Sequence, residues 1–222
     1  MKITRRQLRR LIRESIVLSE SAKTPAMLPD DVVVVISLPV PNYVNVYYGN
    51  RNDPKTWTAT THRSEGLPWG RVTLGKTYEG IGECDGAMKI GNAMASPGWG
   101  PLLYDVAMEY ATQNANGLIA DRDGVSPMAR AVWRYYLENR PDVTVHQLDD
   151  LINTLTYPPE DGRVPIEQDN CSQKVAKYSD GWNSNSTASW VNSPLSKRYT
   201  KEPDTMEALA KAGKLVLYDK EK

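Results

Sequence analysis

The fold is decided by residues 87–143, which read AMKIGNAMASPGWGPLLYDVAMEYATQNANGLIADRDGVSPMARAVWRYYLENRPDV. Residues 87–95 predict a strand, and the turn that follows at 96–100 carries two glycines. Pro101 predicts the start of a helix, because its missing N–H would be unpaired at the first helical position. Apolar residues at helical spacing form one face of this helix: Leu102, Leu103, Val106, Ala107, Tyr110 and Ala111.

A short strand and a second helix complete this stretch. Asn116-Gly117 is a turn pair, and residues 118–120 predict a short strand. Ser126 is expected to cap a helix that begins at Pro127 and ends near Asn139. The residues that this helix is expected to bury are Ala129, Val132, Trp133 and Tyr136.

A strand, a glycine-bearing turn and a helix N-terminus form an arrangement that favours anions. Backbone N–H groups point out of the first helical turn, and the helix dipole favours negative charge there. Glycine lets the backbone approach a phosphate closely. The same pattern also fits a tight strand-to-helix turn that binds nothing.

The residues upstream predict consecutive strands. The runs 32–38, 43–48, 71–74 and 76–81 are strand-like, and a polar loop spans 50–70. Strands in succession, without intervening helices, favour an α+β fold with a mostly antiparallel central sheet flanked by helices.

The C-terminal third shows fewer signals. A short helix is expected within 143–155, with Thr144 as a cap, and a second helix is capped by Asp204 or Thr205. Gly213 is expected to end that second helix, before a closing strand at 214–218.

Composition excludes several classes of protein. The 222 residues are 40% hydrophobic and 24% charged, with zero formal net charge. This excludes a disordered chain and argues against nucleic-acid binding over the whole surface. No apolar run approaches the ~20 residues of a membrane helix, so no membrane span is expected. Two cysteines and two histidines without ligand spacing predict no metal site.

The N-terminal 20 residues carry six basic and two acidic side chains, with apolar residues at helical spacing. They predict a basic amphipathic helix that packs on the domain, binds a protein partner or an anionic surface, or serves as a packaging tag. Residues 21–31 are expected to be a linker, and residues 32–222 one domain. The leader MKITRRQLRRLIRES resembles those on proteins of large tailed bacteriophages from marine hosts, which implies a location in the host cytoplasm or the virion.

The order of parts in 87–143 resembles the core of the GNAT family of acyl-coenzyme A N-acyltransferases. In that family a Gln/Arg-x-x-Gly-x-Gly/Ala loop binds the coenzyme pyrophosphate. Gly98 and Gly100 match its glycines, whereas Ala95 takes the leading position. A later family helix begins Asn-x-x-Ala and carries a catalytic tyrosine, and Ser126 and Trp133 stand at the asparagine and tyrosine positions. Tryptophan cannot donate a phenolic proton.

The resemblance implies transfer of an acyl group from acetyl-CoA or another acyl-CoA to an amine. It implies a coenzyme site formed by Ala95, Gly98, Trp99, Gly100, Leu102 and Ser126. The candidates for the proton acceptor are Glu79 and Glu83, of which we expect Glu83, and Tyr136, one helical turn beyond Trp133, is expected as the acid. The alternatives are a catalytically silent GNAT-like domain that serves as a phage or virion-associated binding protein, and an unrelated α+β structural protein. The last interpretation, an unrelated α+β structural protein, requires that Val32 to Ala95 not form one sheet beside the glycine turn.

Overall fold

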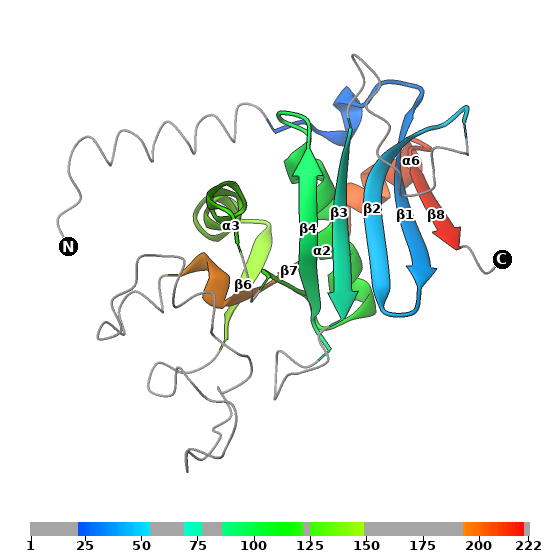
Figure 1. The fold of residues 1–222 in the computed structure, drawn as a ribbon. Helices are drawn as coiled ribbons and strands as arrows, with labels where there is room; N and C mark the ends of the chain where they lie inside the picture. The colour runs from blue at the N-terminus through cyan, green and yellow to red at the C-terminus, as the bar shows by residue number, and fades with distance from the viewer. Residues whose placement is uncertain (1–21, 54–68, 77–85, 122–124, 149–192, 220–222) are drawn as a thin grey trace, which may run out of the picture.

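The computed structural model describes residues 22–53, 69–76, 86–121, 125–148 and 193–219. Within these residues the fold is α+β, as the sequence predicts. Eight strands form one mixed sheet in the order β6-β7-β5-β4-β3-β2-β1-β8, and helices α2, α3 and α6 pack around it (Figure 1).

The first four strands form an antiparallel meander. They are β1 (Val32–Val40), β2 (Tyr43–Asn50), β3 (Gly70–Lys76) and β4 (Met88–Ala95). The strands expected at 32–38, 43–48 and 87–95 are confirmed. The break expected at residue 75, between the runs 71–74 and 76–81, is wrong: β3 continues through Gly75, which pairs with Tyr43 on one side and Lys89 on the other. Residues 77–81 of the second run lie outside the described part of the chain. Val32 to Ala95 therefore contribute neighbouring strands of one sheet.

The sheet is mixed because two neighbouring pairs of strands are parallel. β5 (Leu118–Ile119) runs parallel to β4, since helix α2 (Gly100–Asn114) returns the chain to the starting end of β4. β8 (Leu215–Asp219) runs parallel to β1. The other neighbours, including β7 (Lys197–Lys201) between β5 and β6 (Val143–Gln147), are antiparallel.

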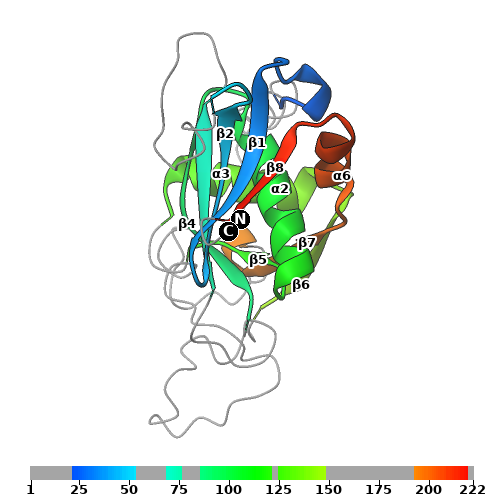
Figure 2. The same ribbon diagram turned by 90° about the vertical axis from the view of Figure 1, so that its right-hand side faces the viewer.

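Helix α2 is buried on nearly every side, more than its single apolar face predicts. It packs on the sheet, and α6 (Asp204–Lys211) packs against it from the outside (Figure 2). Helix α3 (Pro127–Asn139) contacts α2 through aromatic rings: Trp133 lies edge-on to Tyr104 at 5.7 Å, and Tyr136 stacks on Tyr104 at 6.1 Å between ring centroids. Ser126 caps α3 as expected, since its Oγ accepts from the Ala129 amide at 3.2 Å.

The helix expected within 143–155 is wrong at its beginning. Residues 143–147 form β6, whose register pairs Val143 with Lys201 and Val145 with Tyr199. A partner strand more than 50 residues later supplies the hydrogen bonds, and this long-range pairing outweighs the local preference. Residues 149–155 lie outside the described part of the chain.

Helix α6 begins where predicted, but its cap does not come from Asp204 or Thr205. The carboxylate of Glu109, on α2, accepts the amides of Thr205 at 2.9 Å and Met206 at 2.6 Å. The predicted end at Gly213 is confirmed, with a left-handed φ of 64°. The predicted closing strand corresponds to β8.

The second half of the expected linker is tied to the domain. A short 3-10 helix, η1 (Pro25–Met27), precedes Leu28, which is buried and whose carbonyl accepts the Lys214 ammonium. The expected N-terminal helix at 1–20 lies outside the described residues.

Candidate functional site

The turn between β4 and α2 has a backbone that suits glycine. Gly98 has a φ of 80°, in the left-handed region that side chains disfavour. Helix α2 begins at Gly100 with no side-chain cap and no acidic residue in its first turn. The positive end of its dipole is therefore not neutralised by a carboxylate of its own first turn.

The carbonyl groups of this turn are occupied by donors from four parts of the chain. The bonds are Lys23 N to Gly98 O at 2.9 Å, Tyr48 hydroxyl to Trp99 O at 2.7 Å, Tyr136 hydroxyl to Pro101 O at 3.0 Å, and Trp99 N to Ser96 O at 3.1 Å. These bonds come from the segment before β1, from β2, from α3 and from the turn itself. The turn is thus fixed from several directions.

The glycine amides of the turn differ from its carbonyls in their hydrogen bonding. Pro97 and Pro101 have no N–H, and the Ser96 amide donates to Trp69 O at 2.9 Å. Among the described residues, the amides of Gly98 and Gly100 donate to no group of the chain. Two donors at a helix N-terminus therefore remain available to an external acceptor.

Strands β4 and β5 separate next to this turn. The parallel pairing of β4 with β5 covers two register pairs, Met88 with Leu118 and Lys89 with Ile119. Beyond them, residues 90–95 of β4 pair with β3 on one side and face no described strand on the other. A register shift that leaves Gly91 unmatched lies at the point of divergence. Backbone groups on the open edge of β4 are thus free of a strand partner within the described residues.

An ion pair lies where β4 and β5 are still paired, next to the point at which they separate. Lys89 Nζ of β4 is 4.0 Å from Asp121 Oδ1, two residues beyond β5, and both side chains are about one-third exposed. The turn itself carries no charged residue from 95 to 104. Lys23 brings a positive residue to the turn, through its backbone bond to Gly98.

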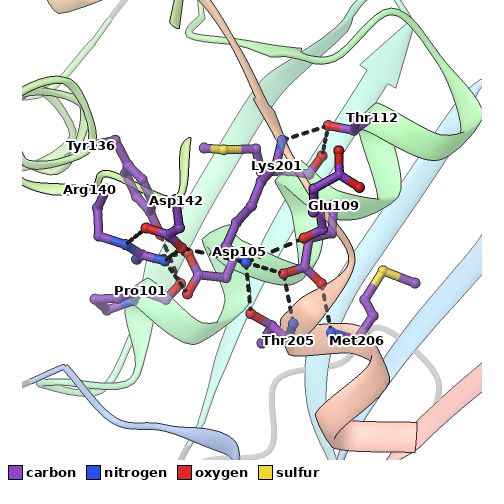
Figure 3. Close-up of polar contacts among 12 residues, drawn as sticks. Pro101, Asp105, Glu109, Thr112, Tyr136, Arg140, Asp142, Lys201, Thr205 and Met206 are labelled. Carbon is purple, nitrogen blue, oxygen red and sulfur yellow. Dashed lines mark hydrogen bonds and ion pairs between the residues drawn. The ribbon is translucent and has the colours of Figure 1, made fainter. Parts of the chain in front are cut away.

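Tyr136, the expected acid, is completely buried, and its side chain lies beside Pro101 and Asp105 (Figure 3). Its hydroxyl lies 2.7 Å from Asp105 Oδ1 as well as 3.0 Å from Pro101 O. Burial, and then the nearby Asp105 carboxylate, raise the pKa of Tyr136 well above its ordinary value. Burial also raises the pKa of Asp105, although Arg140, 3.0 Å away, opposes the shift. This geometry does not expose Tyr136 to a substrate and instead connects α3 to the first turn of α2.

The other predicted site residues are brought together only in part. The Cβ that an alanine at Gly100 would carry lies 3.7 Å from the Ala95 Cβ, so these two positions are adjacent. Trp99 packs edge-on to Tyr48, with ring centroids 5.7 Å apart. Leu102 is buried in the core. The hydroxyl of Ser126 is used as the α3 cap, and Glu83 lies outside the described residues.

The sequence analysis missed the residues that fix the turn. Lys23, Tyr48 and Trp69 lie 27 to 75 positions before the turn residues that they contact. No local pattern in the sequence links any of the three to residues 96–100. In the sequence pattern, Tyr48 is an ordinary residue of the strand predicted over 43–48.

Comparisons with protein-family models, with curated proteins and with solved structures find no match. No helix in the described ranges has the length and apolar character needed to span a membrane. The described residues also contain no group of three or more His, Cys, Asp or Glu side chains that would hold a metal ion.

Proposed function

We propose that this chain binds an acyl-coenzyme A through the turn between β4 and α2, and that it is a GNAT-like N-acyltransferase. One observation carries the proposal: the chain occupies the carbonyls of Ser96, Gly98, Trp99 and Pro101, and among the described residues nothing accepts the Gly98 and Gly100 amides. Donors oriented in advance at a helix N-terminus suit the pyrophosphate of the coenzyme.

The open edge of β4 supports the same ligand. The pantetheine arm of coenzyme A is an extended chain with two amide groups, so it can pair with an open strand edge as an added strand does. Residues 90–95 offer such an edge beside the turn. The carboxyl ends of two diverging parallel strands are also a common place for ligands in open sheets.

The proposed reaction joins an amine to the acyl carbon. The amine nitrogen attacks the thioester carbonyl, a C–N bond forms, and the C–S bond breaks. The amine proton passes to a base, and the coenzyme thiolate leaves and takes up a proton. Glu83 remains our proposed base on the grounds of sequence alone, and Glu83→Gln is expected to lower kcat while leaving coenzyme affinity unchanged.

The burial of Tyr136 favours a second candidate function. A hydroxyl that is buried and bonded within the core is not available to protonate a leaving thiolate. A silent GNAT-like domain would bind the coenzyme without transferring the acyl group. Binding with no acyl transfer across a panel of small amines and lysine peptides would support this alternative.

Isothermal titration calorimetry with acetyl-CoA tests the proposal. Gly100→Asp places a carboxylate at the anion site, and Gly100→Asn is the matched neutral control. The backbone accepts either residue, since a Cβ at position 100 meets only ordinary contact with Ala95. We expect the wild type and the Asn variant to bind, and the Asp variant to bind at least ten-fold more weakly. Absence of binding to the folded wild type at millimolar acetyl-CoA would reject the proposal.

A further inference from the structure

Strand β8 lies at one edge of the sheet, and its outer side has no neighbouring strand among the described residues (Figure 1). Its inner side pairs in parallel with β1 over all five of its residues, Leu215–Asp219. Backbone groups on the outer side therefore have no ladder partner in the part of the chain that the structure describes. An edge of this kind can pair with a further strand.

The side chains of β8 do not protect this edge. Edge strands ordinarily carry charged residues, proline or a bulge, which discourage further pairing. The residues from Leu215 to Tyr218 are all aliphatic or aromatic. The strand at the other edge of the sheet, β6, differs, because its exposed side chains are the polar ones of Thr144 and Gln147. The two edges of one sheet are thus built differently, and β8 is the edge suited to association.

Leu217 stands at the middle of β8 and is 71% exposed. Its register partner on β1 is Ile36, a core residue, so Leu217 lies on the face of the sheet that carries the core helices. Leu215, on the same face, packs on the core. Leu38, two residues beyond Ile36, is 38% exposed. Leu217 and Leu38 thus form an apolar patch at the edge of the sheet, and covering it would be favourable.

A second copy of the chain fits this edge, because a two-fold axis can pair a strand with itself. An axis perpendicular to the sheet makes β8 antiparallel to its copy and keeps each side chain on its own face. Opposite residues must then both come from 215, 217 and 219, or both from 216 and 218. The register that pairs all five residues of β8 is the one centred on Leu217.

We propose that this chain forms a two-fold dimer in which the β8 strands of two copies pair antiparallel, with Leu217 at the axis. The two eight-stranded sheets then become one continuous sheet. This interface is separate from the turn between β4 and α2, so the inference does not depend on the proposed coenzyme.

The sequence of β8 is complementary to itself in this register. Each Leu217 side chain meets its own copy, which covers the most exposed apolar residue of the edge. On the other face Val216 lies opposite Tyr218 of the partner subunit, and a β-branched residue opposite an aromatic one is a favourable cross-strand pair. Val216 and Tyr218 already pack on a buried cluster that includes Val33 and Tyr47, so both side chains are held in place for this contact.

Charged substitutions at Leu217 test the position of the axis. Leu217→Lys and Leu217→Glu each place two like charges opposite one another in a homodimer, whereas a mixed dimer places Lys opposite Glu. We expect the wild type to sediment as a dimer. Each variant alone should have a dissociation constant about 100-fold higher, because two covered leucine side chains are lost. An equimolar mixture of the two variants should recover the dimer.

Met128 provides the matched control, since it is 82% exposed and lies on α3, outside β8. Met128→Lys and Met128→Glu add the same charges and should dimerise as the wild type does. Circular dichroism and the Tm check that the Leu217 variants remain folded, as expected for an exposed position.

Hydrogen exchange gives a readout that needs no substitution, because amides within 215–219 should become more protected as the protein concentration rises. A wild type that stays monomeric at about 100 µM would overturn the proposal, including the case in which β8 pairs with a strand of another protein. A dimer that survives Leu217→Lys, or that the mixture of Leu217→Lys and Leu217→Glu fails to restore, would also overturn it, because the interface would then lie elsewhere.

Discussion

The ammonium of Lys201 lies 2.5 Å from Glu109 Oε1, and both side chains are almost completely buried. Glu109 comes from α2 and Lys201 from the end of β7 (Figure 3). The same carboxylate accepts the amides of Thr205 and Met206 in the first turn of α6, so one side chain on α2 joins two elements, β7 and α6, that follow about 90 residues later.

Replacing Glu109 by Gln should destabilise the protein strongly. The substitution leaves the buried Lys201 ammonium without its principal counter-charge, which costs about 3–5 kcal/mol in comparable pairs. Chemical denaturation measures this loss. The double variant Glu109→Gln/Lys201→Met should recover part of it, because the unpaired charge is then removed.

The pair of Lys89 and Asp121 is the control for this prediction. Its side chains are about one-third exposed and 4.0 Å apart. Exposed pairs contribute about 1 kcal/mol or less, so Lys89→Met should change the free energy of unfolding little. Equal losses in Glu109→Gln and Lys89→Met would contradict the buried-pair argument.

The stability contributed by Asp142 should disappear in acid. Hydrogen bonds from Arg140 are the main cause that lowers the pKa of Asp142 to about 2. A carboxyl whose pKa is lower in the folded state stabilises the fold when ionised, and this contribution is complete above its unfolded pKa of about 4. It is lost as the pH falls from about 4 to about 2. The Tm of Asp142→Asn should therefore lie below that of the wild type at pH 6 and approach it near pH 2. A difference that stays constant across this range would refute the assignment.

Two N-terminal truncations should behave differently. Removing residues 1–20 should leave the Tm and acetyl-CoA affinity nearly unchanged, as expected of a leader. Removing residues 1–24 also deletes the Lys23 amide that donates to Gly98 O, and should weaken coenzyme binding. Thermal scans and calorimetry on both proteins measure the difference. A large loss of Tm on removal of residues 1–20 would show that the leader belongs to the core.

Trp133→Ala should be among the most damaging substitutions on α3. Trp133 is 1% exposed and packs on Tyr199 with ring centroids 4.8 Å apart. Truncating a buried tryptophan costs about 3–5 kcal/mol, because a cavity remains. Met128, on the same helix, is 82% exposed, so Met128→Ala should stay within about 0.5 kcal/mol of the wild type. Similar denaturation midpoints for the two variants would be inconsistent with this core.

Local signals determined most of the elements around the candidate site. The apolar β-branched run of β1, the glycine turn, Pro101 and the cap at Ser126 predict their structures because each depends on neighbours within a few residues. The closing helix and strand are predictable for the same reason. These features establish the α+β class and the presence of a strand, a turn and a helix N-terminus in sequence.

Only the tertiary structure decided how these parts are connected and which groups remain free. Residues 143–147 become a strand because β7 pairs with them, and α6 is capped by Glu109, about 95 residues away. The divergence of β4 from β5 and the bond from the Lys23 amide to the Gly98 carbonyl also depend on contacts between distant segments. Such contacts form only when the chain folds, so no periodicity or motif in the sequence specifies them.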